Sequence, residues 1–156
     1  MTVLPPYAHV PGLNARHPEG AFDGVRASVA EGMDPDALAL TEAWRTGRAW
    51  LDAGYYWEAH EVLEPVWMAC PPNSAERRLV RALIQLANAK LKQRMGRPRA
   101  RDRLLAEAAG LLAECRMGGT RTLLAVSLED SARALEAFRE ACARGAPERE
   151  IPEVAL

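Results

Sequence analysis

The residues best suited to chemistry in this sequence lie in one short block, at positions 55–67. The block reads Tyr-Tyr-Trp-Glu-Ala-His-Glu-Val-Leu-Glu-Pro-Val-Trp. In a helix, where each residue turns by about 100°, five of these side chains share one side. They are Trp57, His60, Glu61, Glu64 and Trp67. Apolar residues occupy the opposite side as well, so the sequence predicts a mostly buried helix whose carboxylates and imidazole need partners.

Two further features concern this polar side. Pro65 cannot donate a hydrogen bond to the carbonyl of Glu61, so we expect a kink and a freed carbonyl beside the cluster. Polar residues also recur at helical spacing later in the chain, and they are Arg81, Gln85, Asn88 and Lys92. We expect Gln85, Asn88 and Lys92 to lie opposite the cluster as hydrogen-bond partners.

The cluster of His60, Glu61 and Glu64 is consistent with three roles. The first is a structural network, in which Arg81 or Lys92 closes ion pairs. The second is a divalent-metal site, because His60 and Glu64 have the spacing of the two histidines in H-E-x-x-H, with glutamate in place of the second histidine.

A metal site of that kind would need a further ligand, and His9 or His17 would have to fold back from the N-terminal arm to supply it. The third role is a small-ligand or catalytic pocket, because a carboxylate surrounded by indoles is suited to general acid–base chemistry. No nucleophile motif identifies a catalytic residue.

Helix start and stop signals predict the elements that position this block. They indicate about five helices: from Asp34-Pro35 to Gly54, from about Tyr55 to Ala69, from Asn73 to Gly96, from Pro98 to Gly118, and from Ser127 to Gly145. Phe22, Val25 and Val29 also have the spacing of a short helix. The connections are short, so consecutive helices should pack as antiparallel neighbours.

The sequence therefore predicts an all-α fold, a bundle of antiparallel helical hairpins forming one domain over 1–156. This domain includes a proline-rich N-terminal arm at 1–20 and a loose C-terminal tail at 146–156. Six residues of the first hairpin resemble a tetratricopeptide repeat, namely Trp44, Ala49, Gly54, Tyr56, Ala59 and Pro71. We expect the four tryptophans to fill the seam of that hairpin. A tetratricopeptide-like hairpin suggests the alternative function of a protein-interaction or structural module, in which the buried charges only fix the fold.

Composition narrows the classes of partner. The chain has 20 Lys+Arg and 21 Asp+Glu and a formal charge of −1, which argues against nucleic acid or an acidic membrane as the partner. A basic run at 75–103 lacks interleaved aromatic residues, so we interpret it as a solvated face. No signal peptide or membrane span is expected. The cysteines, Cys70, Cys115 and Cys142, form no C-x-x-C pair, which favours a reducing cytoplasm.

Three segments carry a resemblance to a known family. These are Gly54–Trp67 with its His-Glu-x-x-Glu-x-x-Trp pattern, the sequence Leu-Ile-Gln-Leu-Ala at 83–87, and Met95-Gly96 before a leucine-rich helix. Together they resemble domain-of-unknown-function family 309. The opening at 5–12 and Met117-Gly118 are similar to its proteobacterial branch, whereas Gly96-Arg97 departs from the usual Gly-Asn. The resemblance implies a small all-helical protein of bacteria and archaea with no assigned activity.

Overall fold

The helices of the protein follow the predicted order. The computed structural model describes residues 2–145, so the tail predicted at 146–156 lies outside the described residues. In that part of the chain there are seven helices: α1 (Asp23–Arg26), α2 (Pro35–Leu40), α3 (Glu42–Ala53), α4 (Tyr56–Ala69), α5 (Ala75–Arg94), α6 (Pro98–Met117) and α7 (Leu128–Ala143). The all-α prediction is confirmed. The count exceeds five because α1 forms and because the first long helix is divided.

The division lies at Thr41, where the sequence predicted a continuous helix. Thr41 is extended, with φ −63° and ψ 148°. Its hydroxyl donates to the carbonyl of Leu38 at 2.8 Å and accepts from the amide of Trp44 at 3.2 Å, so it ends α2 and caps α3. The break turns Leu40 outward. Leu40, the last residue of α2, is 73% exposed.

Helices α3 and α4 form the first antiparallel hairpin. Gly54 ends α3 at φ 92°, the left-handed conformation expected there. Gly47 lies where the two helices meet most closely. A β-carbon at position 47 would come within 2.5 Å of Leu63, so only glycine permits this approach.

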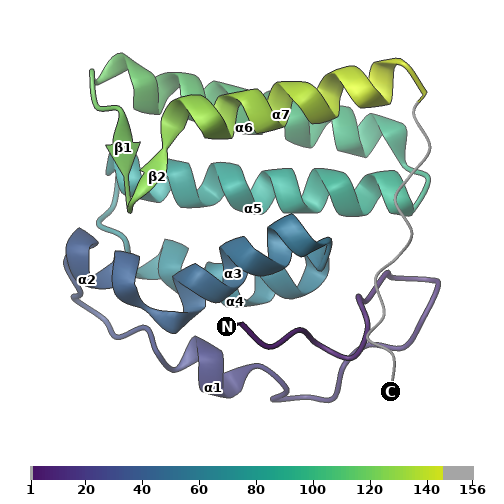
Figure 1. The fold of residues 1–156 in the computed structure, drawn as a ribbon, viewed down its shortest axis with the longest axis horizontal. Coiled ribbons are helices and arrows are strands. Elements are labelled where there is room, and N and C mark those ends of the chain that lie inside the picture. The colour runs from purple at the N-terminus through teal and green to yellow at the C-terminus, as the bar shows by residue number, and fades with distance from the viewer. Residues whose placement is uncertain (1, 146–156) are drawn as a thin grey trace.

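Helix α5 lies between the α3–α4 pair and the α6–α7 pair (Figure 1). The residue that caps it is Ser74, whose hydroxyl accepts from the amide of Arg77 at 3.1 Å. The predicted cap, Asn73, lies one residue earlier and is left-handed, with φ 62°. The helix start predicted at Asn73 was therefore wrong by one residue. Ser127 caps α7 as predicted.

A small antiparallel hairpin between α6 and α7 was not predicted. It pairs β1 (Thr122–Leu123) with β2 (Val126–Ser127) through a turn in which Leu124 and Ala125 have positive φ. The indole of Trp44 donates to the carbonyl of Leu124 at 2.9 Å. This bond joins the turn to α3.

The N-terminal arm is ordered and has almost no regular structure, as its prolines predicted. It runs along the α3–α4 side of the molecule, where α1 also lies (Figure 1). Ala8 and Val10 are fully buried, and the indole of Trp50 donates to the carbonyl of Val3 at 3.0 Å. The arm is therefore part of the core, and it brings residues 7–22 to α4.

Candidate functional site

The most unusual buried group in the described structure is the carboxylate of Glu58. Glu58 is 0% exposed, because it lies on the face of α4 that also carries Ala59, Val62 and Val66. An isolated carboxylate in such surroundings is strongly disfavoured. Burial and, secondarily, the charge of Glu58 also raise the pKa of the neighbouring Tyr55. The partners of Glu58 therefore decide whether this arrangement is stable.

Both partners of Glu58 come from the arm. Its Oε1 accepts the backbone amide of His9 at 2.6 Å and lies 2.7 Å from Nε2 of His17. Its Oε2 is enclosed and has no hydrogen-bond partner among the described residues. One oxygen thus anchors two segments of the arm, and the other is an unsatisfied acceptor of a kind that is rare in folded proteins.

A turn around Asn14 presents the amide of His9. The Asn14 side chain accepts from the amide of Val10 at 2.9 Å and donates to the carbonyl of Ala8 at 2.9 Å. Its carbonyl oxygen also lies 3.1 Å from Nδ1 of His9. These bonds fix the backbone so that the amide of His9 points at Glu58.

Aromatic contacts fix the ring of His17. The ring of Tyr7 stacks on it at 4.4 Å between centroids, with an interplanar angle of 15°. Phe22 contacts it edge-on at 5.2 Å, and Trp57 lies 6.0 Å away. With Nε2 bonded to Glu58, the imidazole has one defined orientation.

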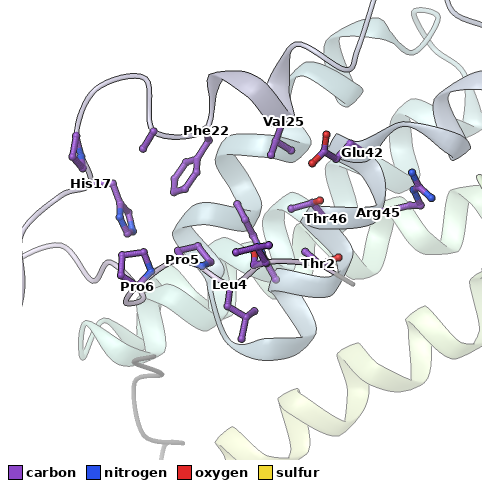
Figure 2. A pocket seen from close by; sticks show the side chains of 14 residues that line it. Thr2, Leu4, Pro5, Pro6, His17, Phe22, Val25, Glu42, Arg45 and Thr46 are labelled. Carbon is purple, nitrogen blue, oxygen red and sulfur yellow. The ribbon is translucent and has the colours of Figure 1, made fainter. Parts of the chain in front are cut away.

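His17 lines two cavities. The larger, about 700 Å³, lies between the arm, α1 and α3. Figure 2 shows His17 near Pro6 and Phe22 at one end of this cavity, and Glu42, Arg45 and Thr46 at the other. The smaller, about 490 Å³, lies between residues 16–26 and α4. The buried Glu58–His17 pair therefore reaches the wall of both cavities.

The predicted cluster on α4 has a different environment from the one expected. His60, Glu61 and Glu64 are half-buried. Within residues 2–145, no hydrogen bond or ion pair joins their side chains to one another or to α5. Glu61 lines the smaller cavity, but His60 and Glu64 line neither. The structure therefore does not bring the three together as one site.

The polar residues of α5 bond toward α6. Gln85 donates to Glu107 at 3.0 Å, and Asn88 donates to Gln85 at 3.1 Å. Arg81 pairs with the same Glu107 at 2.6 Å. The hydrogen bond from Gln85, with those from Arg81, holds the pKa of Glu107 below its usual range against the effect of burial. Gln85 and Asn88 thus serve the α5–α6 contact, and Lys92 on the same stripe is half-buried with no bond to the α4 cluster.

The four tryptophans are divided between three environments. Trp44 and Trp50 are buried with α3, as expected. Trp57 is half-buried against the arm and lines the smaller cavity. Trp67 lies under the guanidinium of Arg77, 4.6 Å from its ring centroid. The prediction that all four fill one seam was therefore wrong for Trp57 and Trp67.

Pro65 frees the carbonyl of Glu61, as the sequence predicted. That carbonyl accepts a hydrogen bond from Nη1 of Arg26 in α1. The proline thus creates an acceptor on α4 that an arginine from a separate element satisfies. The polar group beside this carbonyl comes from α1, which sequence spacing did not indicate.

Neither a metal cluster nor a membrane span is present in the described part of the chain. No group of three or more His, Cys, Asp or Glu side chains within residues 2–145 is placed so that it could hold a metal ion. Among the same residues no helix is long and apolar enough to cross a membrane. The structure thus gives no support to the expectation of a divalent metal at His60, Glu61 and Glu64.

Sequence reasoning missed Glu58, His9 and His17 as one site. A signal for Glu58 was present, because it lies four residues before Val62 on the apolar face of the helix. The histidines were considered only as metal ligands that fold back from the arm. They do fold back, and the group that the amide of His9 and the ring of His17 meet is the Glu58 carboxylate of α4.

The segment that carries Glu58 can be compared with known proteins. The model of a family described as Domain of unknown function (DUF309) matches residues 44–104, from α3 into α6. The family resemblance is confirmed over these residues. No curated protein and no solved structure matches the chain. The DUF309 match includes Glu58 and Glu61 but not the arm, so His9 and His17 lie outside it.

Proposed function

We propose that this protein binds a small molecule in the larger cavity and that His17 provides its main polar contact. The observation that carries the proposal is the fully buried Glu58, which accepts from His17 at 2.7 Å on the wall of that cavity. A buried carboxylate that fixes an imidazole is a costly arrangement, and such arrangements are common where a histidine has to present its other nitrogen to a ligand.

The lining supports a ligand with an apolar body. Most of the residues around the cavity are apolar, among them Leu4, Pro5, Phe22, Val25 and Trp50. The polar residues of the lining are Thr2, His17, Glu42, Arg45 and Thr46. The volume of about 700 Å³ lies within the range of roughly 300–1,000 Å³ that is usual for small-molecule sites, which typically combine apolar walls with a few polar groups.

His17 would supply the directional contact. Because Nε2 is engaged by Glu58, Nδ1 is the nitrogen left for a ligand. The stacked ring of Tyr7 prevents the imidazole from turning away. A ligand group that hydrogen-bonds to Nδ1 would therefore meet a pre-oriented partner, which lowers the entropic cost of binding.

The alternative is a structural or protein-interaction module. It is favoured by one observation, that Glu58 anchors two parts of the arm and so holds the arm on α4. A tetratricopeptide-like first hairpin would then bind a protein partner, and the buried pair would serve only the fold. The two proposals differ in whether blocking the cavity changes the binding of small molecules.

We place this activity in the cytoplasm. Cys70 and Cys115 are buried and form no disulfide within the described residues. Unpaired cysteines are usual in proteins of a reducing compartment.

Ligand-observed NMR with a fragment library tests the proposal, using the intact protein and a Val25→Trp variant that fills the cavity. Fragments with an apolar ring and one hydrogen-bonding group are expected to bind the natural protein and to lose binding in the variant. Leu40→Trp is the matched control, because Leu40 is exposed and lies outside the cavity. Equal fragment binding by Val25→Trp and the natural protein would favour the structural or interaction module.

A further inference from the structure

The smaller cavity has a lining of different chemistry. It measures about 490 Å³ and lies between residues 16–26 and α4. Five of its lining residues carry formal charge: Arg16, Glu19, Asp23, Arg26 and Glu61. We infer that this cavity is a second site, next to the larger one, which binds a small zwitterion of the free α-amino acid type.

The charges around this cavity are unpaired. Among residues 2–145, none of the five forms an ion pair, although cations and anions line the same space. Elsewhere neighbouring opposite charges do meet, as in Arg81 with Glu107 at 2.6 Å and Arg78 with Glu114 at 3.1 Å. The cavity therefore offers charges of both signs that form no ion pair within the described residues.

Arg26 and Glu61 are the two members best placed to act on a ligand. Both are half-buried, so their charges are less screened than those of exposed residues. Nη1 of Arg26 donates to the main-chain carbonyl of Glu61, which Pro65 leaves free. This bond holds the guanidinium of Arg26 beside Glu61, but the guanidinium does not bind the Glu61 carboxylate. The cation and the anion thus stand close together on two different elements, α1 and α4.

This arrangement suits a ligand that carries both charges. A carboxylate would bind the guanidinium of Arg26, with Arg16 at the rim, and an ammonium group would bind the carboxylate of Glu61. Two arginines and three carboxylates line the cavity, so it presents groups that can bind a negative and a positive charge at once. The carboxylates do not form a group that could hold a metal within the described residues.

The remaining lining provides room for a side chain. Trp57, Phe22 and Ala21 supply apolar surface, and the guanidinium of Arg16 lies 5.2 Å from the ring centroid of Trp57. That contact holds Arg16 against one of the lining residues. The ligand class is therefore an amino acid with an apolar side chain.

Calorimetric titration of the full chain with each standard amino acid in turn tests this inference. We expect saturable binding of at least one apolar amino acid, such as leucine or phenylalanine. Its N-acetyl form and its amide, each lacking one charge, are expected to bind at least about tenfold more weakly, because each loses a charge-assisted hydrogen bond.

Two glutamates of α4 give a matched pair of variants. Glu61→Gln is expected to weaken binding of the amino acid by at least about tenfold, whereas Glu64→Gln, also half-buried but outside the cavity, leaves it unchanged. Val25→Trp fills only the larger cavity and is expected to leave amino-acid binding intact, which separates this site from the proposed function. Absence of binding by every amino acid, equal binding of the blocked forms, or equal losses in the two glutamate variants would overturn the inference.

Discussion

At the scale of single residues, both the position of the arm and the candidate site depend on Glu58. Its Oε1 satisfies an amide and an imidazole from the arm, while its Oε2 is enclosed without a partner in the described structure. A residue of this kind stabilises the fold through its partners and strains it through its unsatisfied oxygen. The balance between the two is measurable by substitution.

Removing the Glu58 carboxylate is expected to be costly. Glu58→Ala leaves the amide of His9 and the ring of His17 without an acceptor and opens a void, so the free energy of unfolding should fall by about 3–5 kcal/mol. Glu58→Gln keeps the shape and one acceptor, and should cost about 1–3 kcal/mol. Urea unfolding followed by circular dichroism measures both values.

Glu64→Gln is the control for this series. Glu64 is half-buried on the same helix and has no bond to a described residue, so the change should stay within about 0.5 kcal/mol. If Glu64→Gln costs as much as Glu58→Gln, the burial pattern derived for α4 is wrong.

Because of Cys70, we expect the stability of the protein to fall at alkaline pH. Burial, helped by the charge of Glu76, raises the pKa of the Cys70 thiol from 9.0 to about 11. A raised pKa favours the neutral thiol in the folded state, so its contribution is complete below about pH 9 and is lost as the pH rises to about 11. Unfolding free energies of the natural protein should therefore fall over that interval.

The comparison variant for this pH effect is Cys70→Ala. Its unfolding free energy should fall less over the same interval, since the residue that titrates has been removed. The same alkaline loss in both proteins would assign the effect to other groups.

Sequence alone located the helix that carries Glu58 but selected His60, Glu61 and Glu64 on it and not Glu58. The His60, Glu61 and Glu64 side was chosen because three ionisable groups gather there, whereas the structure leaves that side half-buried. Glu58 was missed because a single carboxylate on an apolar face gives a weaker pattern than a cluster. Its partners lie 41 and 49 residues away in the chain, and helical periodicity contains no information on such pairs.

At the scale of elements, the close packing of α3 on α4 depends on Gly47. An alanine there would place its β-carbon 2.5 Å from Leu63, which is itself fully buried and has no space into which to move. We expect Gly47→Ala to lower the unfolding free energy by about 1–3 kcal/mol through overpacking.

An alanine at Gly110 in α6 is expected to have the opposite effect on the unfolding free energy. It is exposed, and nothing lies within 4 Å of a β-carbon built at that position. Gly110→Ala should therefore stabilise the protein by about 0.5–1 kcal/mol, through helix propensity and lower unfolded-state entropy. Thermal or urea unfolding distinguishes the two, and a neutral Gly47→Ala would mean that the helices lie further apart.

The contact between α1 and α4 can be tested by a double-mutant cycle on Arg26 and Pro65. Arg26→Ala alone leaves the Glu61 carbonyl without its donor and should cost about 1–3 kcal/mol. In a Pro65→Ala background, residue 65 regains an amide that can donate to that carbonyl. The cost of Arg26→Ala should then shrink by about 0.5 kcal/mol or more, and identical costs in the two backgrounds would contradict the contact.

The observed helices and strands show which local sequence signals predict the ends of elements correctly. Gly54, Pro98 and Ser127 marked helix ends correctly, because left-handed turns, a first-turn proline and a side-chain cap act within a few residues. The break at Thr41 and the β1–β2 hairpin were missed. Thr41 is an unremarkable helix residue in the pattern, and the hairpin turn uses Leu124 and Ala125, which rarely adopt positive φ.

At the scale of the whole molecule, the N-terminal arm adds parts of the core and of the cavities that α3 to α7 do not supply. It buries Ala8 and Val10, supplies both partners of Glu58, and provides walls for both cavities. The family match covers α3 to the start of α6, whereas His9 and His17 come from outside it. The candidate site is therefore formed jointly by the matched segment and the arm.

The most direct test of the central claim is ¹⁵N NMR of the His17 ring in the natural protein and in Glu58→Gln. The claim is that Glu58 holds His17 through Nε2 and leaves Nδ1 for a ligand. It predicts a slowly exchanging proton on Nε2, distinct signals for the two ring nitrogens, and a marked change of both in Glu58→Gln. Averaged ring signals like those of a solvent-exposed histidine, unaltered by Glu58→Gln, would contradict it.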